Sequence, residues 1–281
     1  MASGRTVLIT GANSGIGLET ARALASGGAR VLMLCRSVPR ATAARDEILR
    51  TAPDADLEIV ECDLGSQAAV RSTAAHLTGT LDRLDVLVNN AGVTLRGPQR
   101  TDEGHDAMLA INQLGPFLLT ESLRPLLVAS APARVVTVAS HAHRFAKTVD
   151  LEHLDTPSGY GPLGFRRYGE TKLMNILWTR ELARRLDGSG VTANAVHPGG
   201  VRSNLGNPAP WQRALVSPFL VPPERGAETS VFLATEASVA ATTGGYWAKC
   251  RRVDDKLTAA ARDDDLARRL WDANIELTGA A

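Results

Sequence analysis

The sequence predicts an α/β fold, in which a single doubly wound parallel sheet of about seven strands carries helices on both faces. Short runs rich in Val, Ile and Leu alternate with longer helical patterns along most of the 281 residues. Several of these runs are apolar almost throughout, which is typical of strands covered on both faces. No repeat or low-complexity linker interrupts the alternation, and we therefore expect one domain over residues 1–281.

The expected strands are short and are separated by stretches long enough for helices. They cover Val7–Thr10, Ala29–Leu34, Leu57–Val60, Val86–Asn89, Arg134–Ala139, Val191–Val196 and Tyr246–Ala248. The helical patterns between them cover Gly17–Ala25, Arg40–Thr51, Gln67–Leu77, Asp106–Val128 and Arg166–Leu186. A strand–helix–strand order of this kind gives right-handed crossovers and a parallel sheet.

Two more helices are expected toward the C-terminus. One begins at Pro222-Pro223-Glu224, because proline tolerates the first helical turn and an acid suits its positive end. The other covers Asp263–Leu277 and begins with a run of acids.

Two long stretches without helical or strand patterns follow the fifth and sixth strands. They are His141–Gly164 and Arg202–Pro223, both rich in proline or glycine. Long irregular loops in compact domains tend to form sites or lids. Both leave from the carboxyl edge of the sheet, where ligands bind in open α/β folds. We expect residues 202–223 to form a substrate loop, and its apolar side chains predict an apolar pocket wall.

The overall charge and the cysteines exclude several classes of function. The net charge is +1, and no Lys/Arg cluster indicates a nucleic acid or an anionic membrane as partner. The strand-like run Arg5–Thr10 begins almost at the first residue, so we expect neither a signal peptide nor a membrane anchor. Cys35, Cys62 and Cys250 lack metal-ligand spacing, which favours a reduced, cytoplasmic location and no bound metal.

A glycine-rich turn joins the first strand to the first helix. It reads Gly11-Ala12-Asn13-Ser14-Gly15-Ile16-Gly17. Glycines at such a point let the backbone turn tightly and approach a pyrophosphate at the amide-rich start of the helix. The spacing is G-x-x-x-G-x-G and not G-x-G-x-x-G, so the strand–turn–helix context carries the inference. We predict a Rossmann-type dinucleotide site contacted by Gly11, Asn13, Ser14, Gly15, Ile16 and Gly17, the alternative being a turn without a ligand.

Arg36 stands at the end of the second strand, where the choice between NAD and NADP is made. An acid near this point would bond the ribose 2′-OH of NAD, whereas an arginine suits the 2′-phosphate of NADP. No acid occupies residues 32–40, so we predict NADP(H) in preference to NAD(H). Arg36 could instead be a solvated strand-end charge. Asp63, after the third strand, is a candidate acceptor for the adenine amino group or, alternatively, a turn or helix cap.

Tyr168 and Lys172 lie one helical turn apart in a segment that is otherwise typical of buried helix. A cation beside a tyrosine hydroxyl is expected to lower the pKa of the phenol, which is normally about 10. Such a tyrosine exchanges a proton with an alcohol or carbonyl oxygen. Ser140 ends the fifth strand and can donate to the same oxygen, or it can be a plain strand-end cap. Asn175 continues the same helical face, and we interpret it as a structural hydrogen-bonding residue.

The ordered set of these motifs resembles the short-chain dehydrogenase/reductases nearly from end to end. The motifs are Gly11/Gly15/Gly17, Asp63-Leu64, Asn89-Asn90-Ala91-Gly92, Asn112, Ser140, Tyr168/Lys172 and Pro198-Gly199. Four short segments are similar in sequence to those of the retinol-dehydrogenase-like branch. They are Leu34-Cys35-Arg36, Ser140-His141-Ala142-His143, Thr171–Asn175 and Val196–Gly199.

The resemblance implies further roles. Asp63, Leu64, Asn90, Ala91 and Gly92 would lie on the adenine-ribose side of the cofactor. Pro198, Gly199 and Val201 would pass near the nicotinamide carboxamide. Lys172 would also hold the nicotinamide ribose, and Asn112 would support a water relay to that lysine, although it could be an ordinary satisfied helix residue. Proteins of this family often pair through their long helices, so a homodimer or homotetramer is possible.

The sequence therefore predicts an oxidoreductase that interconverts a carbonyl and an alcohol with NADP(H) on a small, apolar substrate. Two alternatives stay open on the same fold. The protein could bind a dinucleotide without catalysis, as a redox sensor, or it could be an epimerase or dehydratase with a retained cofactor. His141 and His143 adjoin Ser140 and could touch the substrate, whereas His197 is expected to be a packed loop residue.

Overall fold

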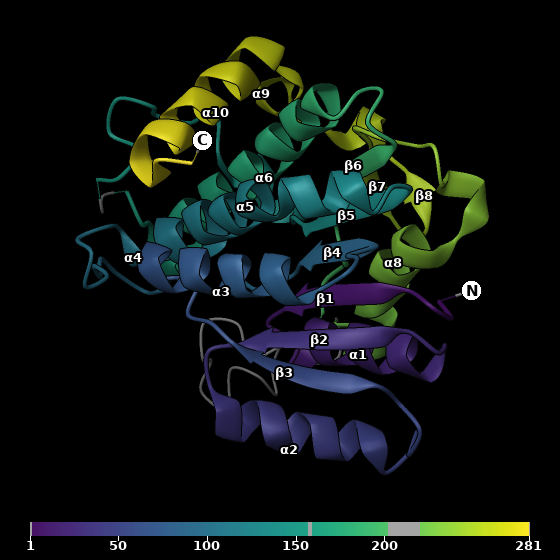
Figure 1. Ribbon diagram of the computed structural model, residues 1–281. Coiled ribbons are helices and arrows are strands. Elements are labelled where there is room, and N and C mark those ends of the chain that lie inside the picture. The colour runs from purple at the N-terminus through teal and green to yellow at the C-terminus, as the bar shows by residue number, and fades with distance from the viewer. Residues whose placement is uncertain (1, 157–158, 202–219, 281) are drawn as a thin grey trace.

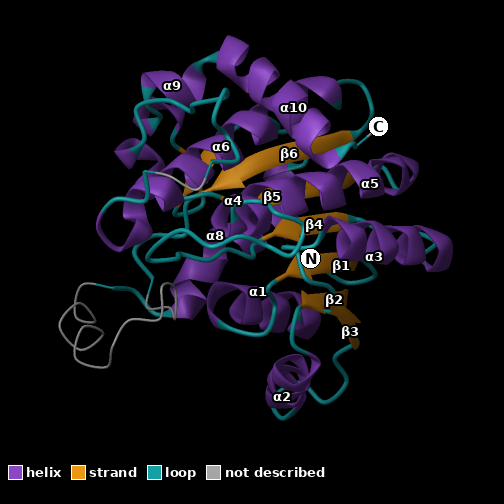
Figure 2. Cartoon of the chain, turned by 90° about the vertical axis from the view of Figure 1, so that its left-hand side faces the viewer, coloured by secondary structure: helices purple, strands orange, loops and turns teal. Residues whose placement is uncertain are grey.

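A computed structural model describes residues 2–156, 159–201 and 220–280. Its centre is one sheet in the order β3-β2-β1-β4-β5-β6-β7-β8. The strands are β1 (Thr6–Thr10), β2 (Arg30–Cys35), β3 (Leu57–Glu61), β4 (Val86–Asn89), β5 (Ala133–Val138), β6 (Val191–Val196), β7 (Tyr246–Ala248) and β8 (Arg251–Arg252). Neighbours from β3 to β7 pair in parallel. Figure 2 shows these strands one above another, from β6 down to β3.

The sheet is buried on both faces because its strands are apolar at successive positions. In β1, Leu8 faces one core cluster while Val7 and Ile9 face the other, as the two-residue period of a strand requires. Leu32 and Met33 of β2 divide between the two clusters in the same way. The prediction of a parallel α/β sheet from near-continuous apolar runs is confirmed.

Helices cover both faces of this sheet. They are α1 (Gly15–Ser26), α2 (Val38–Leu49), α3 (Gln67–Thr80), α5 (Gly115–Ala129), α6 (Phe165–Arg185) and α8 (Pro223–Thr235). The core cluster of one face takes in residues of α3, α5 and α6, and that of the other takes in residues of α1, α2 and α8. The helix expected to begin at Pro222-Pro223-Glu224 is α8, with Pro222 at its N-cap.

Three elements differ from the sequence prediction. The sheet has an eighth strand, because β8 turns back through Lys249 and Cys250 and pairs antiparallel with β7. The helix expected over Asp106–Val128 is interrupted: α4 (Ala107–Leu109) is followed by a π-helical turn at Ala110–Leu114 before α5 begins. The C-terminal helix is preceded by a short α9 (Ala259–Arg262) and runs as α10 (Asp264–Thr278).

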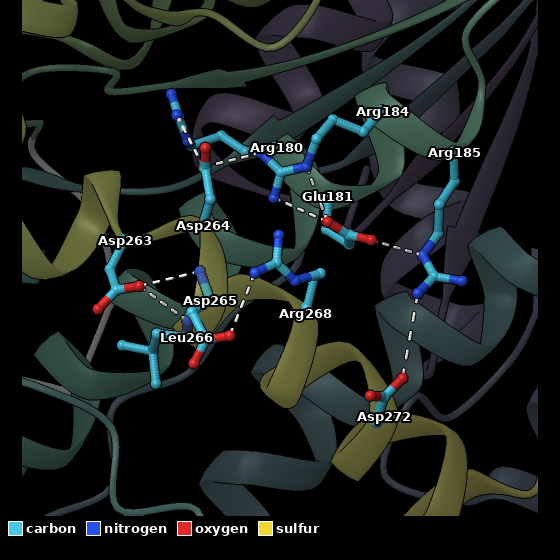
Figure 3. A network of polar contacts seen from close by, with 10 residues as sticks. All are labelled: Arg180, Glu181, Arg184, Arg185, Asp263, Asp264, Asp265, Leu266, Arg268 and Asp272. Carbon is cyan, nitrogen blue, oxygen red and sulfur yellow. Dashed lines mark hydrogen bonds and ion pairs between the residues drawn. The ribbon is translucent and has the colours of Figure 1, made fainter.

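α10 lies outside the two helical layers, packed on α6. Figure 1 shows it with α9 as an outer layer beside α6. Its Trp271 meets Phe117 of α5 edge to face with the ring centroids 4.8 Å apart. A set of ion pairs joins the two helices at the surface, as in Arg184 with Asp264 at 2.8 Å (Figure 3). The exposed pairs add little stability, so the main attachment of α10 is the burial of its apolar side chains Leu266, Ala267, Leu270 and Trp271.

Candidate functional site

The carboxyl ends of β1 and β4 are joined by hydrogen bonds beside the glycine turn. Thr10 Oγ1 accepts from the backbone N–H groups of Asn90 and Ala91, each at 2.9 Å. The Asn90 side chain donates back to the carbonyl of Thr10 at 2.8 Å. Thus the glycine turn and the Asn90-Ala91-Gly92 segment, predicted from separate motifs, form one surface at the sheet edge.

The glycine turn is shaped for close approach of another molecule. Gly11 and Gly15 have φ angles of +66° and +56°, in the left-handed region that favours glycine. A Cβ on Gly17 would lie 2.3 Å from the carbonyl oxygen of Gly11, so only glycine lets α1 begin this close to β1. Ser14, the N-cap of α1, makes no side-chain cap, and the first turn contains no acid. The first amides of α1 are therefore available to an anion such as a pyrophosphate, and this geometry fits a dinucleotide.

Arg36 and Asp63 face each other across the ends of β2 and β3. Their side chains approach to 3.8 Å, and that of Arg36 is 70% exposed. Asp63 Oδ1 also accepts from the N–H of Gly65 at 2.8 Å, so this carboxylate caps its own turn. The capping interpretation of Asp63 therefore has a structural basis beside the predicted adenine contact. Leu64 is buried beneath, where its carbonyl packs against Gly115.

Tyr168 and Lys172 lie side by side on α6 and are both buried. The Lys172 ammonium stands 5.6 Å from the centre of the Tyr168 ring, and burial lowers its pKa to about 8. Burial also raises the pKa of Tyr168 to about 12, and the hydroxyl of Ser140 opposes this by hydrogen bonding. The expected net lowering of the tyrosine pKa is therefore wrong for the protein alone, since the loss of solvation outweighs the neighbouring groups.

Asn112 lies in the π-helical turn and not in a regular helix. Its side chain accepts from the N–H of Val93 at 2.7 Å and donates to the carbonyl of Val93 at 2.8 Å. It also donates to Thr171 Oγ1 on α6 at 3.1 Å. A π-turn in a helix is a frequent mark of a functional site. Here it lets one asparagine join the segment after β4 to the helix that carries Tyr168 and Lys172.

Ser140 caps a short 3-10 helix, His141–Phe145, that follows β5. Its hydroxyl accepts from the N–H of Ala142 at 3.1 Å, and His143 Nδ1 donates to its carbonyl at 2.7 Å. The His141 ring stacks on His197 with centroids 4.0 Å apart, so the end of β5 is tied to the loop after β6. Burial lowers the pKa of His197 to about 3, so this imidazole is neutral and packed, as expected.

Apolar side chains pack around Tyr168. Met108, Ala142, Tyr160 and Tyr168 form one buried cluster, with Val93 and Leu95 packed against it. Gly164 permits this closure, because a Cβ there would meet the carbonyl of Leu95 at 1.8 Å. The predicted substrate loop falls mostly on residues 202–219, which lie outside the described residues.

The loop after β6 returns to the start of α1. Val201 forms a bridge with Val221, and a Cβ on Gly226 of α8 would lie 2.7 Å from Val201 and 3.0 Å from Ile16. Ile16 and Val201, predicted as cofactor contacts from opposite ends of the chain, therefore converge on Gly226. Pro198 and Gly199 lead into this contact, and Gly199 has a φ of +93°.

Sequence reasoning missed Thr10 and Gly226, and it expected a structural hydrogen bond of Asn175 without naming its partner. Thr10 could have been found from its place as the last residue of the first strand. Asn175 bonds to Lys172 itself, which the helical spacing of three residues permits. Gly226 left no signal, since its use depends on a packing contact with residues far away in the sequence.

Over the described ranges, no helix is both long and apolar enough to cross a bilayer. Within the same part of the chain, no group of three or more His, Cys, Asp or Glu side chains is arranged to hold a metal ion.

The fold and this edge of the sheet are those of a dinucleotide-binding α/β protein. Comparisons with known proteins identify the family within that class. Residues 5–149 match the family model described as short chain dehydrogenase. The chain is 42% identical to human dehydrogenase/reductase SDR family member 13 over 98% of this chain and 74% of that protein. It is 41% identical to human retinol dehydrogenase 12, over 98% and 87%. A crystal structure of an uncharacterized protein from Mycobacterium paratuberculosis superposes with a TM-score of 0.80 at 32% identity, over 99% and 94%.

The chain belongs to the short-chain dehydrogenase/reductase family, in the retinol-dehydrogenase-like branch. The resemblance inferred from the sequence motifs is thereby confirmed. Membership in this family supports an oxidoreductase that binds NAD(P) and interconverts an alcohol and a carbonyl.

Proposed function

We propose that this chain is an NADP(H)-dependent oxidoreductase that interconverts a carbonyl and an alcohol on a small, apolar substrate. The observation that carries the proposal is the convergence of Ser140, Tyr168 and Lys172. They lie beside the apolar cluster around Tyr168 and next to the glycine turn. These side chains come from two elements far apart in sequence, the end of β5 and the middle of α6.

The preference for NADP(H) is supported by Arg36. Its largely exposed guanidinium at the end of β2 can form a paired, charge-assisted contact with a 2′-phosphate. Asp63, 3.8 Å away, competes for the same guanidinium but leaves it accessible. The glycine turn, Asn90 to Gly92 and Pro198 to Val201 would hold the rest of the dinucleotide.

In the reductive direction, the roles of the chain follow from where each proton sits. Ser140 donates a hydrogen bond to the substrate carbonyl and polarises it. Tyr168 gives its phenolic proton to the same oxygen as negative charge develops there. Lys172 then stabilises the phenolate that remains. The nicotinamide, when bound, supplies the hydride. Burial raises the pKa of Tyr168, so the phenol carries the proton that this step transfers.

Val93 and Leu95, which are partly exposed and pack against the cluster that contains Tyr168, support an apolar substrate. Association as a homodimer or homotetramer and location in the cytoplasm stay predictions from the sequence. Residues 202–223 stay the predicted substrate loop.

Steady-state oxidation of NADPH with a panel of aliphatic and aromatic aldehydes and ketones tests the proposal. Tyr168→Phe should lower kcat on the best substrate by about 10²-fold or more, as loss of a general acid does. Tyr246→Phe is the matched control, because it removes the hydroxyl of a buried tyrosine on β7 that makes no hydrogen bond among the described residues. Full activity in Tyr168→Phe would refute the mechanism. Tight NADPH binding without turnover would favour a binding protein, and turnover without net NADPH consumption would favour an epimerase or dehydratase.

Arg36→Asp tests the cofactor preference. It should weaken NADPH by about tenfold or more relative to NADH, because it replaces a phosphate partner by a like charge. Arg40→Asp is a control for a general change of charge in the same region. An unchanged ratio of the two affinities in Arg36→Asp would exclude the role given to Arg36.

A further inference from the structure

Asn175 lies between two residues already placed in the site. Its side chain is 2% exposed and sits on α6, one turn beyond Lys172. Its Oδ1 accepts from Lys172 Nζ at 3.1 Å, and its Nδ2 donates to the backbone carbonyl of Asn112 at 2.9 Å. The second N–H of the amide faces Gln113 Oε1 at 3.2 Å.

The orientation of this amide is determined by its partners. An ammonium group only donates, so the atom that faces Lys172 is the amide oxygen. A backbone carbonyl only accepts, so the atom that faces Asn112 is the amide nitrogen. Each polar atom of Asn175 therefore has a partner, and a flipped amide would place like groups together at both ends.

We propose that Asn175 is a positioning residue of this site, an amide that ties the Lys172 ammonium to the π-turn carbonyl of Asn112. The inference rests on the proposed oxidoreductase function. The water relay to Lys172 that the sequence resemblance implies for Asn112 stays a prediction, and the side chain of Asn175 joins the same two residues directly. An amide N–H does not ionise near neutral pH, so the bridge fixes the lysine without passing a proton.

The bridge also determines where the ammonium points. Lys172 donates to the carbonyl of Val138 at 2.7 Å and to Asn175 at 3.1 Å, which uses two of its three N–H bonds. Nζ lies 3.4 Å from where a Cβ on Gly92 would be. The third N–H is left for the side on which Gly92 lies, where the nicotinamide ribose is proposed to bind.

The groups that face the Lys172 ammonium are nearly all neutral. They are the Val138 carbonyl on β5, Gly92 after β4 and the Asn175 amide on α6, and this amide is bonded in turn to Asn112 and Gln113 on the π-turn. Tyr168, on α6 itself, is the titratable side chain beside it. Among the described residues, burial is the cause that lowers the pKa of Lys172, and no charged side chain contributes. A change at position 175 therefore acts on Lys172 without a competing ion pair.

Two substitutions that keep the branched shape and the number of heavy atoms of Asn175 should move the titration of Lys172 in opposite directions. Asn175→Leu removes an acceptor from the ammonium form and should lower its pKa by about one unit. Asn175→Asp places a carboxylate against the ammonium and should raise the pKa by about one to three units. Thr179→Val is the control, since Thr179 is buried one turn further on and bonds to the backbone carbonyl of Asn175, not to Lys172.

The titration can be read directly, because the chain has four lysines, Lys147, Lys172, Lys249 and Lys256. In protein labelled with ¹³C at lysine Cε, NMR follows each ammonium against pH, and Lys172→Arg identifies the Lys172 signal. We expect the Lys172 midpoint to fall in Asn175→Leu, to rise in Asn175→Asp and to stay in Thr179→Val. The alkaline limb of kcat for carbonyl reduction should move in the same directions.

The outcomes separate this inference from the proposed function. An unchanged Lys172 midpoint in Asn175→Asp, the isosteric variant, overturns the amide bridge even if Asn175→Leu fails to fold. Wild-type protein that turns over no substrate while the midpoints shift as expected would overturn the proposed function and leave the bridge in place. A purely structural role would reduce the stability of both variants without moving either midpoint.

Discussion

A buried ionic group anchors the long loop after β5 to α6, and removal of Asp106 should show how much stability it provides. Asp106 is fully buried and caps α4 by accepting from the N–H of Leu109 at 2.7 Å. It accepts from the Tyr160 hydroxyl at 2.6 Å and stands 3.5 Å from Nε of Arg167, which is 2% exposed. Tyr160 belongs to the apolar cluster that contains Tyr168. The ionic group of Asp106 therefore connects folding stability to the shape of the site.

The cost of Asp106→Ala follows from these partners. Loss of the helix cap costs about 1 kcal/mol, and an unpaired buried hydroxyl on Tyr160 about 1–3 kcal/mol. Loss of one partner from a buried ion pair costs about 3–5 kcal/mol. Arg167 keeps Glu170 at 2.7 Å and the carbonyl of Leu154 at 2.6 Å, which reduces the last figure. Since the contributions overlap, we expect a total loss of about 3–5 kcal/mol in the free energy of unfolding.

Urea unfolding followed by circular dichroism measures this loss, and the melting temperature should fall by about 6–20 °C. Asp150→Ala is the matched control, because Asp150 bonds to His153 at an exposed position and its removal should leave the free energy of unfolding almost unchanged. A loss below about 1 kcal/mol in Asp106→Ala, or one equal to that of the control, would refute the argument that this group anchors the loop.

Two further predictions concern the glycine turn and the histidine stack. Gly17→Ala should weaken NADPH binding by about tenfold or more, because the added methyl meets the Gly11 carbonyl at 2.3 Å and displaces the start of α1. Calorimetric titration measures this, with Gly79→Ala, where a Cβ meets nothing within 4 Å, as the control. His197 has a folded-state pKa near 3 against about 6.5 unfolded, so the unfolded chain binds the extra proton and stability should fall as the pH drops from about 6.5 toward 3. His197→Phe should reduce this slope in urea unfolding measured across that range, and an unchanged slope would assign the acid sensitivity to other groups.

The sequence was sufficient for the fold because the signals for its elements are local. Runs such as Val7–Thr10 and Val191–Val196 are apolar enough to specify buried strands, and each is followed by turn residues and a helix. The π-turn at Ala110–Leu114 was not predictable, because it lies within one continuous apolar helical pattern. Its stabilisation depends on Asn112 and on partners from elsewhere in the chain.

The residues of the candidate site could be named from motifs, but the contacts between them could not. Spacing places Lys172 and Asn175 on one face of a helix, yet only the fold brings the Asn112 carbonyl to that face. Likewise, Ile16 and Val201 come from motifs at opposite ends of the chain, and Gly226 is what allows them to meet. Contacts of this kind depend on packing between distant segments, for which a single sequence has no periodic signal.

The pKa of Tyr168 likewise depends on contacts that a single sequence does not show. The sequence argument considered the attraction between a phenolate and the neighbouring ammonium, which lowers the pKa of the phenol. In the fold, loss of solvation by burial raises the pKa of Tyr168 to about 12, against the smaller opposing effect of the Ser140 hydrogen bond. Lys172 is itself desolvated, and it is held by Val138 and Asn175 at 5.6 Å from the ring centre. A helical spacing of four residues thus predicts that the two groups are neighbours. The proton affinity of the phenol depends on what else the ammonium binds, and for that reason Asn175 belongs to the description of this site.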